Sequence, residues 1–232
     1  MSNVLIIGAS SGIGKALARQ LAVTGTTVYG TYSKTEESPT PEIKSFRSLQ
    51  VLDDSIALDY LPDRLDGLVY CPGSIVLKPF ARIKPEEFMQ DYALQVVGAV
   101  RVIQACLPRL KNSPNSSIVL FSTVAAQLGF NFHSLVASSK GALEGLVKAL
   151  AAEFAPGVRI NGVAPSITNT PLAKGLLNTP EKLEANAQRH PLKRIGTPED
   201  VANLCQFLLS EQSSWVTGQI FHVDGGLSAV RH

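Results

Sequence analysis

The sequence predicts an α/β fold in which a doubly wound parallel sheet lies between two layers of helices, giving three layers in all. Short, wholly apolar segments alternate with longer segments of helical periodicity along the 232 residues, as in a parallel sheet covered on both faces. The apolar segment that opens the chain also runs straight into a glycine-rich turn and an amphipathic helix. No long polar linker interrupts this pattern, so we expect one domain spanning residues 1–232.

Composition narrows the classes of function. The net charge is +2 and the 21 Lys and Arg residues are scattered, so no nucleic-acid-binding surface is predicted. Cys71, Cys106 and Cys205 are odd in number and lack metal-ligand spacing, which predicts reduced thiols of a cytoplasmic protein and no metal site. The first predicted strand leaves no room for a signal peptide, and polar residues interrupt the charge-free stretch 112–139, so no membrane span is predicted.

The first strand, turn and helix form a candidate phosphate-binding site. Residues 4–7 are apolar and β-branched in part, and apolar residues then recur every four positions through residue 21, so a helix begins within the glycine run. Free N–H groups of a first helical turn bind a pyrophosphate, and missing Cβ atoms let it approach. The candidate residues are Gly8, Ser10, Ser11, Gly12, Ile13 and Gly14. An ordinary strand-to-helix turn is the alternative.

The glycine spacing G-x-x-x-G-x-G of this turn is one residue wider than the usual dinucleotide fingerprint and resembles that of the short-chain dehydrogenase/reductase family. The resemblance implies a Rossmann-like fold that binds a nicotinamide dinucleotide and a small-molecule substrate. It extends over almost the whole chain through the motifs that follow. Members of the family are commonly tetramers, so a homo-oligomer, tetramer or dimer, is expected through the long helices and the last strand.

The end of the second predicted strand, residues 28–32, bears on the choice between NAD and NADP. An NAD site typically places a carboxylate there, whereas hydroxyl and ammonium donors suit a 2′-phosphate. Ser33 and Lys34 stand at this position, with Glu36 and Glu37 slightly later, so we expect NADP(H). A solvated polar loop is the alternative for Lys34.

The next two predicted strands contribute further cofactor residues. The third strand ends at Gln50 and Val51, which the resemblance adds to the cofactor site, and a brief helix is expected after it. The fourth strand ends in Cys71, Pro72 and Gly73, where the family has Asn-Asn-Ala-Gly, and the resemblance places this backbone along the cofactor.

A helix predicted for residues 85–107 carries Gln95 where the family has Asn, and residues 117–123 form the fifth strand. Its carboxyl end lies where the catalytic groups of open α/β sheets gather.

The helix predicted for residues 134–154 carries Lys140 on its apolar face. A buried ammonium is costly unless a polar group meets it, although a lysine can also reach out to water. The family motif is Tyr-x-x-x-Lys with a Ser thirteen residues before the Tyr, and these positions are Val136, Lys140 and Thr123 here. The resemblance gives Lys140 the role of binding the nicotinamide ribose and Thr123 that of polarising the substrate, while the phenol acid is replaced by valine.

His133 is the candidate replacement for the missing phenol. An imidazole pKa of ~6.5 suits proton delivery near neutrality. His133 precedes Val136 by three residues and Lys140 by seven, so one extra helical turn would align all three. Seven is also the Tyr-to-Lys separation in the enoyl-reductase branch of the family. The alternative is a loop histidine packed at the start of the helix.

The last third of the chain contains the sixth strand, a predicted flap and the closing strand. The sixth strand, residues 158–165, resembles the family's V-N-x-V-x-P-G, and the resemblance places Pro165, Thr168 and Thr170 near the nicotinamide. Residues 171–194, with a helix start at Thr179, are expected to cover the substrate. A capped helix from residue 197 and a closing strand within residues 219–226 follow.

These motifs leave two functions open. The resemblance implies NADP(H)-dependent reduction of a 3-oxoacyl- or ketone-like carbonyl or of an activated C=C. The alternative is a catalytically silent NADP(H)-binding subunit that stabilises a partner or senses the cofactor, because the Tyr, Ser and Asn of the family are all replaced. The two readings differ in whether the protein turns over a substrate.

Overall fold

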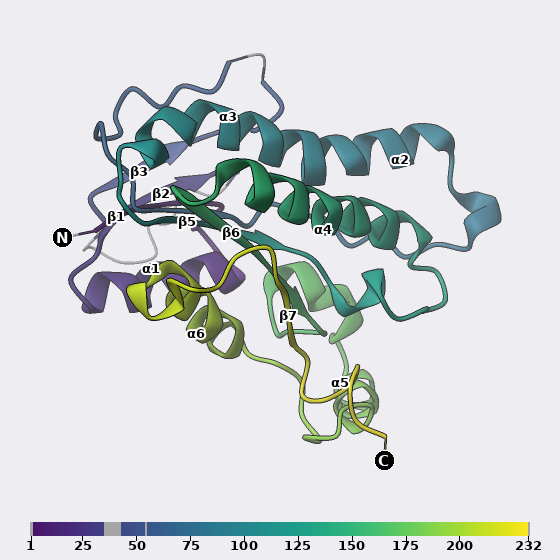
Figure 1. Cartoon of the computed structure of the whole chain (residues 1–232). Helices are drawn as coiled ribbons and strands as arrows, with labels where there is room; N and C mark the ends of the chain where they lie inside the picture. The colour runs from purple at the N-terminus through teal and green to yellow at the C-terminus, as the bar shows by residue number, and fades with distance from the viewer. Residues whose placement is uncertain (1, 35–42, 54, 232) are drawn as a thin grey trace.

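The structure is a computed structural model that describes residues 2–34, 43–53 and 55–231, so Glu36 and Glu37 lie outside the described residues. Its centre is a parallel sheet with the strand order β3-β2-β1-β4-β5-β6-β7 (Figure 1). The order reverses beside β1, which is the doubly wound topology. The strands are β1 Asn3–Ile7, β2 Thr27–Tyr32, β3 Ser45–Ser48, β4 Gly67–Tyr70, β5 Ser116–Phe121, β6 Val158–Pro165 and β7 Ile220–Val223.

Helices cover both faces of this sheet, so the predicted three-layer fold is confirmed (Figure 1). One face carries α1 Gly12–Val23 and α6 Pro198–Leu209, and the other carries α4 Ser134–Phe154 and a long helix. That long helix consists of α2 Pro85–Tyr92, the π-helical turn η2 Ala93–Val97 and α3 Gly98–Lys111. By length and composition alone it could cross a membrane, but here its apolar side packs on the sheet.

Strand β1 shows how the sequence divides the core between the two faces. Val4 and Ile6 belong to the cluster under α1 and α6, whereas Leu5 and Ile7 belong to the cluster under α3 and α4. Successive side chains of a strand point to opposite faces, so an unbroken apolar run is what a strand covered on both sides requires.

The brief helix expected after the third strand is not formed: residues 55–66 follow an irregular path. Leu58, Leu61 and Leu65 are buried against the α3 side of the core, so their helix-like spacing is satisfied by packing of loop residues instead. Pro62, which has no N–H group, lies in the middle of this segment. Strands β3 and β5 also end two to three residues before the predicted boundaries.

The predicted helix starts in the last third of the chain are confirmed. Thr179 caps α5 Pro180–Gln188, with its hydroxyl accepting from the N–H of Lys182 at 3.3 Å. Thr197 caps α6 in a capping box with Asp200. Residues 171–194, the predicted flap, contain a 3₁₀ turn, η4 Pro171–Leu176, and then α5.

Candidate active site

A cavity of about 920 Å³ opens at the carboxyl ends of the central strands. Its walls come from the segments that follow β1, β4, β5 and β6, from α4, and from residues 171–194. Ligands of open α/β sheets bind at this edge, next to the point where the strand order reverses. The geometry alone therefore makes this cavity the candidate active site.

The glycine turn forms one end of the cavity and has the shape of a phosphate cradle. Gly8 and Gly12 have φ values of +81° and +52°, which glycine adopts without strain. A Cβ on Gly14 would stand 2.3 Å from the carbonyl oxygen of Gly8. Ser11 caps α1 without a side-chain bond to the first-turn amides, so these N–H groups are available to an anion. The residues present thus fit a dinucleotide pyrophosphate.

Ser33 and Lys34 also line the cavity, beyond the glycine turn. The amide of Gln50 brackets Ser33: its nitrogen donates to the carbonyl oxygen of Ser33 at 2.7 Å, and its oxygen accepts from the Ser33 hydroxyl at 3.0 Å. Gln50 therefore holds Ser33 in the cavity wall but does not itself line the cavity. Val51 packs in the core against Gly98. The structure does not bring these two predicted residues to the cavity because β3 ends at Ser48 and the chain turns away.

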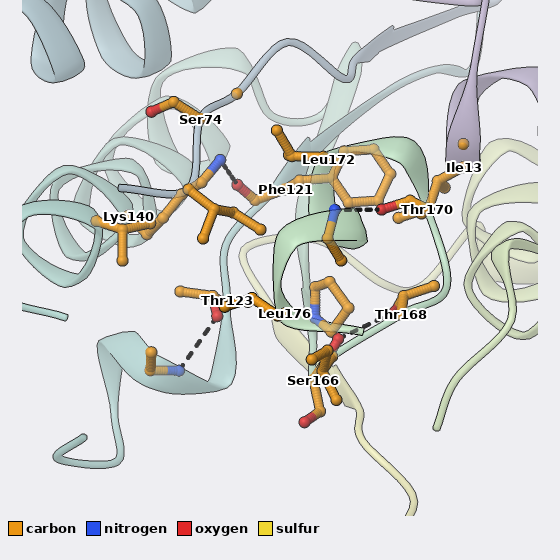
Figure 2. Close-up of a pocket in the computed structure, with 18 of the residues that line it drawn as sticks. Ile13, Ser74, Phe121, Thr123, Lys140, Ser166, Thr168, Thr170, Leu172 and Leu176 are labelled. Atoms are coloured by element: carbon orange, nitrogen blue, oxygen red, sulfur yellow. Dashed lines mark hydrogen bonds between the residues drawn. The ribbon is translucent and has the colours of Figure 1, made fainter. Parts of the chain in front are cut away.

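Lys140 extends from α4 into the middle of the cavity wall, and its side chain is buried (Figure 2). Its Nζ donates to the carbonyl oxygen of Phe121, at the end of β5, at 2.8 Å. Burial lowers the Lys140 pKa to about 8, with Asp91 and Cys71 acting in the opposite direction. Lys140 is thus held in place and does not reach out to bulk water.

A buried polar cluster lies beside Lys140. Asp91 accepts from the Gln95 amide at 2.8 Å and from the Ser74 hydroxyl. The Gln95 Oε1 has no partner among the described residues. A Cβ on Gly73 would lie 3.4 Å from this oxygen and 3.6 Å from Lys140 Nζ, so both atoms face one small space beside Gly73. An unpaired buried acceptor near an ammonium is suited to a water molecule that joins them.

The other predicted catalytic positions line the same cavity. Val136 lies one turn before Lys140 on α4 and is buried. Thr123 follows β5, and its Oγ1 accepts from the N–H of Ala125 at 3.3 Å, which leaves its own hydrogen free to donate (Figure 2). His133 directly precedes α4, and its Nδ1 lies 2.8 Å from the carbonyl oxygen of Asn131. A carbonyl only accepts, so we assign the hydrogen to Nδ1, leaving Nε2 as the second proton site.

The exit of β6 forms another wall, where Pro165 lines the cavity. Thr168 and Thr170 line it as well (Figure 2). Here the Ser166 hydroxyl donates to Nε2 of His190 at 2.8 Å, and His190 Nδ1 donates to the carbonyl oxygen of Asn186 at 2.8 Å. His190 is buried. Both ring nitrogens are used, so this imidazole fastens residues 171–194 to the end of β6.

Comparison with known proteins decides the family. The family described as Enoyl-(Acyl carrier protein) reductase matches residues 8–228. The chain belongs to the short-chain dehydrogenase/reductase family. A tropinone reductase homolog of Arabidopsis thaliana is 33% identical over 241 residues, covering 97% of this chain and 91% of the relative. The 3-oxoacyl-[acyl-carrier-protein] reductase FabG of Thermotoga maritima is 35% identical over 241 residues, covering 96% of each.

Solved structures agree with this family. The structure of ElxO with NADP bound superimposes with a TM-score of 0.90 at 28% identity, covering 99% of both chains. A Tyr-to-Phe variant of ElxO with NADPH bound gives a TM-score of 0.86 at 28% identity, again covering 99% of both chains. ElxO, one of the chain's structural neighbours, therefore binds a nicotinamide cofactor.

The family motifs located most of this site but missed two polar pairs. Ser74 with Asp91, and Ser166 with His190, join residues 17 and 24 positions apart. One signal was present: Asp91 and Gln95 are polar residues four apart on a helix whose core side is otherwise apolar. Among the described residues, no group of three His, Cys, Asp or Glu side chains is placed to hold a metal ion.

Proposed function

We propose that the protein is an NADP(H)-dependent oxidoreductase that reduces a 3-oxoacyl- or ketone-like carbonyl, or an activated C=C, by hydride transfer. One observation carries the proposal: the glycine cradle and the buried Lys140 open into the same cavity as Thr123 and His133. The relatives named as tropinone reductase homolog and 3-oxoacyl reductase support the carbonyl chemistry. The cavity is large enough for both a cofactor and a substrate.

Ser33 and Lys34 support the choice of NADP(H) over NAD(H). Both line the cavity beyond the glycine cradle, and no Asp or Glu belongs to its described lining. An ammonium and a hydroxyl bind a 2′-phosphate, which a carboxylate at this position would repel. ElxO, similar over nearly the whole chain, has NADP bound.

The chain's residues would position the cofactor and substrate and stabilise the charge that develops. The bound nicotinamide supplies the hydride. The Lys140 ammonium, fixed on the carbonyl oxygen of Phe121, binds the ribose hydroxyls and places a positive charge near the reacting oxygen. The Thr123 hydroxyl donates a hydrogen bond to the substrate oxygen. Leu172, Ala173 and Leu176 line the cavity and would shield the reacting atoms from water.

We also propose that Val136 stands at the position of the family's catalytic tyrosine, so the proton donor is non-standard. Val136 lines the cavity four residues before Lys140, and valine cannot transfer a proton. His133 lies in the same lining, with Nδ1 oriented by the backbone oxygen of Asn131. In its cationic form, Nε2 would deliver the proton to the substrate oxygen.

Replacing His133 by alanine should therefore slow NADPH oxidation with ketones and enones by about 10²-fold or more, which is the size of a general-acid contribution. NADPH binding, measured by fluorescence titration, should be unchanged. His222→Ala is the matched control because His222 lies outside this cavity and is exposed. Unchanged turnover in His133→Ala would remove His133 from the mechanism.

The lowered Lys140 pKa predicts a pH dependence of NADPH binding. Below about 8 the side chain is an ammonium, and as the pH rises through about 8 it becomes a neutral amine that attracts the anionic cofactor less. Affinity should therefore be flat between pH 6.5 and 7.5 and decline above pH 8. Titrations of the wild-type protein and of Lys140→Gln test this, since the variant should bind weakly and lack the decline. A wild-type decline retained in Lys140→Gln would assign it to another group.

The alternative function is a catalytically silent NADP(H)-binding subunit. The buried, apolar Val136 favours it, because nothing at that position can act as an acid. Fluorescence titration with NADPH, followed by a panel of ketones and enones, separates the two. Binding with turnover supports the oxidoreductase, binding without turnover supports the silent subunit, and no binding contradicts both. In either case we propose a single cytoplasmic domain that forms homo-oligomers through its long apolar helices.

A further inference from the structure

The charges around the cavity have one sign. Four charged residues belong to its described lining, and all are cations: Lys34, Lys140, Lys182 and Arg189. Lys34 and Lys140 are assigned to cofactor binding in the proposed function. Lys182 and Arg189 lie on or directly after α5, in the segment that closes the substrate side. Neither is used by the cofactor or by the proposed chemistry.

These two cations share one side of their helix. Lys182, Asn186 and Arg189 are spaced i, i+4 and i+7, which places them on the same face, and all three line the cavity. The acidic residues of α5, Glu181 and Glu184, lie outside the lining. The Asn186 amide nitrogen donates to two backbone carbonyl oxygens of its own segment, at 3.4 and 2.8 Å. The groups of this helix that are left for a ligand are therefore the two cations.

Lys182 and Arg189 both contact uncharged side chains. The Arg189 guanidinium lies 5.2 Å from the ring centroid of Phe130, which belongs to the loop between β5 and α4. Lys182 Nζ donates to the Asn178 side chain at 2.9 Å. The ion pairs of the described residues are Arg64 with Asp66, Lys78 with Glu87 and Arg194 with Asp200, so neither cavity cation has a carboxylate partner.

The backbone at Arg189 is also held in place. His190, the next residue, is tied to Ser166 and to the backbone of Asn186, so the end of α5 is anchored to the cavity wall. A guanidinium held over an aromatic ring keeps its N–H donors, and these match the geometry of a carboxylate or a phosphate. The cavity between this helix and Lys140 is bordered by apolar side chains, among them Val136, Leu172 and Leu176.

We propose that Lys182 and Arg189 bind an anionic group of the substrate, a carboxylate or a phosphate ester. The substrate is thus an amphiphilic carbonyl or enone compound whose apolar part occupies the cavity next to Val136 and Leu172 and whose acidic end lies at α5. This assignment rests on the proposed function and narrows its substrate class.

The test uses matched probes that differ in their acidic group. Binding of 5-oxohexanoate is compared with that of its methyl ester, and binding of acetoacetyl-coenzyme A with that of acetoacetyl-N-acetylcysteamine. Calorimetry is done on protein saturated with NADP⁺, which blocks the dinucleotide site without turnover. The anionic probe of at least one pair should bind about tenfold tighter than its neutral partner, as expected for charge-assisted hydrogen bonds. The pair that shows the preference identifies a carboxylate or a phosphate as the group recognised.

Substitutions test whether Lys182 and Arg189 cause the preference for anionic probes. In Lys182→Gln/Arg189→Gln the preference should fall to about twofold or less, whereas Lys111→Gln/Lys174→Gln, which removes two exposed charges outside the cavity lining, should retain it. Equal binding of anionic and neutral probes, no binding of any probe, or a preference that survives in Lys182→Gln/Arg189→Gln overturns the proposal. If NADP⁺ itself does not bind, the proposed function fails, and titrating the carboxylate pair into the free protein still tests α5.

Discussion

A protein carrying Gly14→Ala is expected to lose measurable NADPH binding. A Cβ at this position would lie 2.3 Å from the carbonyl oxygen of Gly8 and 3.2 Å from the Cys71 sulfur. The first contact is with backbone, so α1 must shift away from the end of β1, and this displaces the amides that would hold the pyrophosphate. We expect affinity to fall by about 100-fold or more, and stability to fall by about 1–3 kcal/mol, as for overpacked sites. Fluorescence titration and thermal unfolding measure the two effects.

Gly145→Ala is the matched control for this substitution. Gly145 lies in the interior of α4, and a Cβ there would meet nothing within 4 Å. Alanine in a helix interior is more stable than glycine by about 0.5–1 kcal/mol, so this variant should unfold at a slightly higher temperature and bind NADPH normally. Normal NADPH binding by Gly14→Ala would show that the glycine turn does not form the cofactor cradle.

Val136→Tyr is expected to increase ketone reduction. Val136 lies four residues before Lys140 on α4, so the two side chains project from the same face of the helix into the cavity. A tyrosine hydroxyl near the Lys140 ammonium would have a lowered pKa and could donate a proton to the substrate oxygen. Positioned acids contribute about 10²- to 10⁴-fold, which is the upper limit of the gain, because the wild-type rate already includes the proposed contribution of His133.

Val136→Phe separates the acid from the added volume, because it supplies the ring without the hydroxyl. NADPH oxidation with a panel of ketones should rise in Val136→Tyr and stay at the wild-type level in Val136→Phe. An equal rise in both variants would trace the gain to cavity shape. A wild-type rate that already matches Val136→Tyr would show that another group, with His133 the candidate, supplies the proton efficiently.

The sequence predicted the features that depend on local pattern. The apolar runs, the glycine turn and the helix containing Lys140 each had a period or spacing that only one element satisfies. The prediction of a brief helix after the third strand was wrong. Leu58, Leu61 and Leu65 have helical spacing, yet they pack as residues of an irregular segment. Burial depends on what covers a residue, and a short window of sequence does not record it.

The polar contacts of the site could not be predicted in this way. Asp91 meets Ser74, and Ser166 meets His190, only after the sheet and the 171–194 segment have come together. The resemblance assigned Lys140 its place because a motif fixes its distance from neighbouring residues. A side chain whose partner is supplied by tertiary structure has no such marker in the linear chain.

The hydrogen bonds of His190 also tie a cation of the cavity to the sheet. Its imidazole contacts the Ser166 hydroxyl, at the end of β6, and the backbone oxygen of Asn186 in α5. Arg189 directly precedes His190 and belongs to the cavity lining. The place of this guanidinium therefore depends on a contact between two segments that lie far apart in the chain.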